Sequence, residues 1–299
     1  MFKRIFSLIL ASIFFSCSPN ATDFQPPQLQ NIKVIDNKTI EFTFHKPATI
    51  NNVELEGRDI PVSIDGNIVT FEEPLSPGEL HHIVVDAGTK SGNTTKFKAD
   101  FYSHNANPAE VMFSEFTIRH SAQHRERIEL YVTKAGNLAG LTLHVGQPDK
   151  SQSRSVTLPS FEVKEGDFVT LLMRPLGNES ENTFDIFLPI EPPGLPNSRG
   201  ILLITDRPDG EGKIIDAVAY VDGSGEQPAA FLIQLNWLQK QEAWIGDPVQ
   251  VCGASPTRSI LRRTKVNSKT KDDWYVTVTG GANFSQDRRP SMLKQTCIR

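Results

Sequence analysis

Residues 60–71 read Ile-Pro-Val-Ser-Ile-Asp-Gly-Asn-Ile-Val-Thr-Phe, and this stretch contains the pattern that decides the fold. Its first five residues alternate apolar side chains with others, so one face of an extended strand would be apolar. Asp65-Gly66-Asn67 comes next, and these residue types tolerate the positive φ of a tight turn. Ile68–Phe71 then returns as a second apolar strand. The stretch therefore predicts a β-hairpin.

Similar short, alternating segments continue on both sides of this hairpin. They include residues 39–44, 80–85 and 95–101, with a Pro- and Gly-containing turn at 74–78. About seven strands in so short a segment predict a β-sandwich over residues 29–105. The segment resembles bacterial Ig-like domains of the S-layer type. The residues that carry the likeness are Ile40-Glu41-Phe42-Thr43-Phe44-His45-Lys46-Pro47, Pro74-Leu75-Ser76-Pro77-Gly78, and Asp86 with Ser91-Gly92-Asn93. The resemblance implies a spacer that holds another domain away from a surface.

The strand pattern continues in residues 109–290. Strands are expected at 111–118, 126–132, 137–143, 168–173, 201–204 and 214–220, and the last two flank a turn at 209–212. One helix is expected at about 228–244, with Ser224 as a candidate cap and Pro228 in its first turn. Phe231, Leu235 and Leu238 share one face of that helix, which should pack on the sandwich.

This second segment resembles the lamin tail domain, which is itself an Ig-like sandwich. The likeness runs in order through Ser114-Glu115-Phe116, Ile128-Glu129-Leu130-Tyr131, Asn137–Leu143, Leu203–Asp206, Ile215–Tyr220, Ser259-Ile260-Leu261-Arg262 and Asp273-Trp274. We therefore expect an all-β chain of two tandem Ig-like β-sandwich domains, 29–105 and 109–290, the second with one appended α-helix.

The first 17 residues, MFKRIFSLILASIFFSC, indicate export. Lys3 and Arg4 precede an apolar run that is too short to span a bilayer and suits a signal peptide. Cys17 follows a small residue, a pattern similar to the bacterial lipobox. It predicts a lipoprotein signal peptide at 1–16, an acylated Cys17 and a polar tether at 17–28. An ordinary secretory signal is the alternative. The protein would then be anchored in a bacterial membrane, facing the periplasm or the cell surface.

Two further cysteines, Cys252 and Cys297, are expected to pair, because exported proteins meet an oxidising compartment. The bridge would close a loop of about 45 residues and stabilise the fold by roughly 4 kcal/mol. Two unrelated thiols are the alternative. Two distant cysteines without a nearby histidine are not a zinc ligand set, so no metal or cofactor is expected.

A basic strip at residues 258–271 contains no acidic residue. Its charged members are Arg258, Arg262, Arg263, Lys265, Lys269 and Lys271. A solvated hairpin is the favoured interpretation; a surface for anionic lipid or another envelope polyanion comes second, and nucleic acid third. The net charge of −4 also argues against non-specific nucleic-acid binding.

Catalytic patterns are weak. The chain has no Gly-x-Ser-x-Gly and no His-Glu-x-x-His sequence. Glu115 and Glu129, on neighbouring expected strands, are candidates for a carboxylate pair, but edge or backbone-bonded charges are favoured. The acidic turn at 206–211 lacks the six to eight oxygen ligands of a calcium site.

Other candidates also favour structural roles. Trp237, Trp244 and Trp274 are expected in the core rather than on a sugar-stacking platform. His81 and His82 should face opposite sides of a strand.

The expected function is therefore a non-enzymatic, membrane-anchored envelope lipoprotein. The Ig-like domain would be a stalk, and the lamin-tail-like domain would bind an envelope protein or glycan. Bacterial lamin-tail-like domains also occur attached to secreted nucleases or phosphoesterases. The alternatives are therefore an accessory module for such an enzyme acting in trans, or a binder of anionic lipid or nucleic acid through the basic strip.

Overall fold

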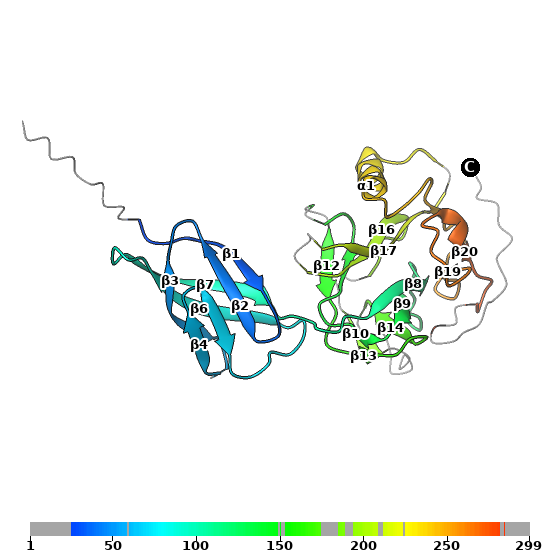
Figure 1. Cartoon of the computed structure of the whole chain (residues 1–299). Helices are drawn as coiled ribbons and strands as arrows, with labels where there is room; N and C mark the ends of the chain where they lie inside the picture. Colours follow the sequence, from blue (N-terminus) through cyan, green and yellow to red (C-terminus); the bar gives the residue numbers. More distant parts are fainter. Residues whose placement is uncertain are drawn as a thin grey trace, which may run out of the picture.

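A computed structural model of the chain describes residues 25–284, except 59, 149, 151–152, 175–184, 189–193, 209–211, 224 and 282–283. This described part is all-β with a single α-helix, as the sequence predicts. None of its helices is long and apolar enough to cross a membrane. Figure 1 shows the strands in two groups, which we call the first body (residues 29–102) and the second body (residues 108–281).

The first body is a sandwich of two antiparallel sheets. Its strands are β1 Leu29–Val34, β2 Thr39–Phe44, β3 Thr49–Leu55, β4 Val62–Asp65, β5 Ile68–Phe71, β6 Leu80–Gly88 and β7 Thr94–Tyr102. One sheet has the order β1-β2-β5-β4 and the other β3-β6-β7. Phe42 and Phe71 from the first sheet share one buried core with Ile83 from the second. The predicted hairpin is confirmed: β4 pairs with β5 across Gly66, whose φ is 63°.

The second body is a larger sandwich. Its strands are β8 Glu110–Phe116, β9 Arg127–Lys134, β10 Gly136–Asn137, β11 Thr142–Val145, β12 Arg154–Thr157, β13 Glu162–Val163, β14 Phe168–Leu172, β15 Ile186–Phe187, β16 Arg199–Thr205, β17 Ile214–Val221, β18 Val249–Gln250, β19 Ile260–Arg262 and β20 Trp274–Val276. Helix α1 is Ala229–Lys240, and a 3-10 turn, η1, is Lys271–Asp273. The two main sheets have the orders β15-β14-β9-β8-β19-β20 and β12-β11-β16-β17-β18, and β10 pairs with β13.

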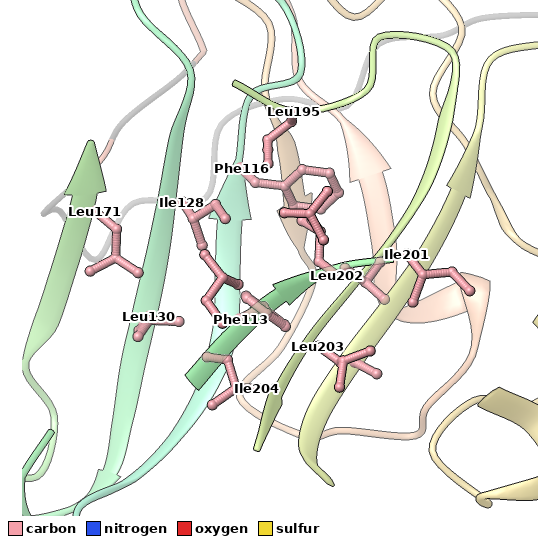
Figure 2. Close-up of a cluster of buried hydrophobic side chains, with 14 of the residues drawn as sticks. Phe113, Phe116, Ile128, Leu130, Leu171, Leu195, Ile201, Leu202, Leu203 and Ile204 are labelled. Atoms are coloured by element: carbon pink, nitrogen blue, oxygen red, sulfur yellow. The ribbon is translucent and has the colours of Figure 1, made fainter. Parts of the chain in front are cut away.

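Side chains from the two main sheets of the second body meet in one core. Figure 2 shows Phe113, Ile128 and Leu130 from one sheet turned toward Leu202 and Ile204 from the other. Strands β16 and β17 are buried on both faces over most of their length. Their near-continuous apolar sequence follows from this, because helix α1 covers part of the outer face.

Helix α1 packs as predicted but is shorter than expected. Phe231, Leu235 and Leu238 are its buried residues, and burying each such side chain contributes about 1.5–3 kcal/mol. The helix ends at Lys240, because Glu242 takes a left-handed φ of 55°. Its N-cap is Pro228, without a side-chain cap, and the predicted cap Ser224 lies outside the described residues.

The strand predicted at 137–143 is wrong as one continuous element. A turn at Ala139–Gly140 separates β10 from β11, and the φ of Gly140 is 85°. This turn packs against the first body at Gly78. A Cβ on Gly78 would lie 2.4 Å from the Gly140 amide nitrogen, so only glycine permits this approach.

Hydrogen bonds hold the chain segment between the two bodies to residues 137–139, next to the turn at Ala139–Gly140. The Asn105 side chain donates to the carbonyl oxygens of Asn137 and Ala139 at 2.9 and 2.8 Å. The Ala109 amide donates to the Asn137 carbonyl at 3.0 Å. The two cores fall in the two predicted segments, whose boundaries at 29–105 and 109–290 stay a prediction.

Candidate ligand groove

A groove of about 430 Å³ opens at one end of the second body, where the start of β8 in one main sheet meets the start of β17 in the other. This volume is within the range of small-ligand sites. Its apolar lining comes from the start of β8 and the start of β17. The lining includes Val111, Met112, Ile214, Ile215, Lys213 and Lys265.

The groove exists because pairing along β8 stops short. On one side β8 pairs with β9, and on the other side it pairs with β19 only at Glu115 and Phe116. Strand β17 is similar, since its parallel neighbour β18 pairs only with Tyr220 and Val221. In the first half of β8 and of β17, one edge of the strand therefore has no neighbouring strand and borders the groove.

Two buried side chains replace the missing strand next to Phe113. The Phe113 amide donates to Asp216 Oδ2 at 2.7 Å, and Arg262 Nε donates to the Phe113 carbonyl at 2.6 Å. Arg262 Nη2 also binds Asp216 Oδ2 at 2.6 Å. Because a buried backbone group without a partner is costly, this ion pair stabilises the end of the ladder.

Arg262 is the centre of a larger buried network. Its guanidinium lies over the Trp274 ring at 4.5 Å, donates to Asn267 Oδ1 at 3.0 Å and lies 3.5 Å from Asp273 Oδ2. Burial raises the pKa of the Asp216 carboxyl, whereas Arg262 and the amide donors around that carboxyl lower it. The network fixes the loop after β19, which supplies Lys265 and Asn267 to the groove.

The structure changes the interpretation of the basic strip. Arg262 was predicted at a binding surface, and this is wrong because its side chain is 2% exposed and fully engaged in the core. A guanidinium that compensates a buried carboxylate and carbonyl is not available to an external ligand. Strand β19, Ile260–Arg262, is only three residues long, so its sequence pattern could not show whether the Arg262 side chain would be buried.

The remaining basic residues do not form one cluster with Arg262. Lys265 is one of the residues that line the groove, and its ammonium lies 4.4 Å from the centre of the Tyr131 ring, which is outside that lining. Arg263 lies over Tyr275 at 5.1 Å. Arg258 donates to Thr279 Oγ1 at 2.8 Å, Lys269 donates to the Glu242 carbonyl at 2.9 Å, and Lys271 binds Asp247 at 2.8 Å. Binding by the exposed residues of the strip stays a prediction.

Glu115 and Glu129 are cross-strand partners on β8 and β9, as expected. Each is 1% exposed, and Ser114 Oγ donates to Glu129 Oε1 at 2.5 Å. Their proximity is therefore real, but both carboxyls lie inside the protein and outside the groove lining. The expectation that the chain is not an enzyme stays a prediction.

The other candidate residues have structural positions. Trp244 and Trp274 are buried and Trp237 packs against the same core, which confirms the core interpretation. His81 is buried while His82 is exposed. Among the described residues, no three His, Cys, Asp or Glu side chains are placed to hold a metal ion. Residues 209–211 of the acidic turn lie outside that part of the chain.

The cysteine predictions fall largely outside the described residues. Cys17 and Cys297 are among the residues that the structure does not describe. Cys252 lies in the second body and is almost entirely buried. Its pairing with Cys297 stays a prediction.

Sequence reasoning missed the groove and its best-placed residues. The sequence predicts Ile214 and Ile215 only as part of a strand, and Lys213 falls between the predicted turn at 209–212 and that strand. One signal was available: Asp216 interrupts an otherwise apolar strand sequence, Ile214–Val221. A carboxylate in a strand buried on both faces requires a partner, and that partner is Arg262, 46 residues away in sequence.

Comparisons with known proteins bear only on part of the second body. No protein with a curated description matches the chain. A family model described as a "protein second domain" matches residues 109–186, about a quarter of the chain. Over those residues, which include β8, β9 and β14, the chain is similar to that family.

Proposed function

We propose that this protein is a non-enzymatic envelope lipoprotein, in which the first body is an Ig-like stalk and the second a lamin-tail-like interaction module. Cys17 would carry the lipid, and the groove would bind an envelope protein or glycan. The observation that carries the proposal is the groove itself. It combines an open strand edge, an apolar lining and the exposed ammonium groups of Lys213 and Lys265.

The junction between the bodies supports a stalk. In Figure 1 the chain enters the first body on the side away from the second body. Gly78 packs directly on Gly140, and Asn105 bonds across the junction to Asn137 and Ala139. These contacts restrain the orientation of the second body, so the groove would be presented at a defined position relative to the first body.

The anchor is tested by expressing the full chain and its Cys17→Ser variant in a bacterial host. We expect the full chain in the membrane fraction with acyl chains found by mass spectrometry, and the variant in the soluble exported fraction. A two-chain or three-chain lipid gives stable membrane attachment. An unmodified Cys17 in a soluble full chain would contradict the anchor.

The groove is tested with residues 18–299 as bait in a solubilised envelope extract. The variant Lys213→Glu/Lys265→Glu should lose a partner that the unchanged chain retains. The matched control Lys33→Glu/Lys90→Glu makes the same charge change on exposed residues of the first body and should retain it. Equal capture by both variants would place the binding site elsewhere.

A further inference from the structure

The edge of β8 has three different surroundings along its length. At Glu115 and Phe116 the partner is the backbone of β19. At Phe113 two side chains take the place of a strand: the Asp216 carboxylate accepts from the Phe113 amide, and the Arg262 guanidinium donates to the Phe113 carbonyl. Two residues earlier, Val111 lies in the lining of the groove.

The backbone of Val111 faces the groove. Val111 is the cross-strand partner of Val132 on β9. The Val132 amide donates to Asp167 and its carbonyl accepts from Gly166, so both groups point away from β8. The pair is therefore of the non-hydrogen-bonded antiparallel type, in which the partner's N–H and C=O also point away from the ladder. Val111 thus offers a donor and an acceptor on the open edge.

The side chains around Val111 are partly apolar and partly charged, which suits an extended peptide whose apolar and acidic residues alternate. A bulge in β17 sets Ile214 beside Ile215 opposite Thr205, and both isoleucines line the groove together with Met112. The charged lining is three lysines and two acids, and Glu110 is already paired with Lys134 at 3.4 Å. The Asp206 carboxylate accepts the Lys213 amide at 2.7 Å.

With three lysines against two acids, the lining carries a net positive charge, to which Lys213 and Lys265 contribute. A carboxylate on the bound molecule would complement them.

We propose that the groove binds an extended, acidic peptide segment of a partner protein, which adds to the edge of β8 through Val111. The inference rests on the proposed function and names the chemistry of its partner. Main-chain hydrogen bonds give affinity in such strand addition, and alternate side chains give specificity. Here one face of the peptide would meet Met112 and Ile215, and a glutamate or aspartate would approach Lys213 and Lys265.

The probe is a capped nine-residue peptide of alternating valine and threonine that contains two glutamates, labelled for fluorescence anisotropy. Two further versions carry N-methyl groups on alternate residues. One version blocks the backbone N–H groups along one edge of the extended peptide, and the other version blocks those along the opposite edge. A fourth version has lysine in place of glutamate. Residues 18–299 should bind the first peptide, and one N-methylated version should bind at least ten-fold more weakly. The lysine version should also bind at least ten-fold more weakly.

Two readouts locate the contact. Hydrogen exchange should slow at the Val111 amide when the glutamate peptide is bound. The Lys213→Glu/Lys265→Glu variant should reverse the preference between glutamate and lysine peptides, whereas Lys33→Glu/Lys90→Glu should leave it unchanged. Full binding of both N-methylated peptides, or unchanged exchange at Val111, would overturn strand addition. If no peptide binds but the groove variant still loses its envelope partner, the inference is wrong and the proposed function stands.

Discussion

Replacing Arg262 tests whether the buried ion pair, rather than a surface charge, explains this residue. Arg262→Met keeps an unbranched apolar side chain but removes the guanidinium, which lies over the Trp274 ring. It removes the donor to the Phe113 carbonyl and leaves Asp216 without its guanidinium. Removing one partner of a buried pair costs about 3–5 kcal/mol, and an orphaned carbonyl adds to that. We expect the second body to lose about 4 kcal/mol of stability.

The assay can observe the second body separately. All three tryptophans of the chain, at 237, 244 and 274, lie in it, so tryptophan fluorescence during urea unfolding reports on this body. Arg263→Met is the matched control, because Arg263 is exposed and contacts the Tyr275 ring. That change should alter stability by about 0.5 kcal/mol or less.

A double change separates the charge effect from the loss of packing. Adding Asp216→Asn to Arg262→Met removes the uncompensated charge, so the double variant should be more stable than Arg262→Met alone. A loss below about 1 kcal/mol for Arg262→Met would refute the reasoning. It would mean that Arg262 is held at the surface, as the sequence pattern alone suggested.

Three further perturbations follow from the structure. Burial lowers the pKa of His81 below 6.5, so as the pH falls the unfolded chain binds a proton at this side chain before the folded chain does. The first body should therefore lose stability below pH 6.5, by at most about 1.4 kcal/mol per pH unit. Unfolding followed by circular dichroism measures this loss, which should be absent in His81→Phe. Gly78→Ala should loosen the junction and raise protease cleavage between the bodies, whereas Gly66→Ala, with a similar φ of 63° but open space around it, should strain only its own hairpin. Cys297→Ser should raise the free-thiol count by one, at Cys252, and lower stability by about 4 kcal/mol, whereas a thiol count that falls by one would contradict the predicted bridge.

The sequence predicted the all-β class because period-two alternation is a local property. Thr39–Phe44 and Ile68–Phe71 appear as strands with the predicted bounds. The apolar face of helix α1 was also predictable, since Phe231, Leu235 and Leu238 follow helical spacing. Local chemistry likewise placed the turn at Gly66, where a positive φ is needed.

Only the tertiary structure decided which charges are buried and where a ladder ends. Arg262 belongs by sequence to a basic strip, but strand pairing places it beside Asp216 in the core. The groove has the same origin, because β19 reaches only the last residues of β8 and leaves the edge at Val111 open. Such features depend on contacts between residues 46 to 149 positions apart, and no local pattern in the sequence encodes them.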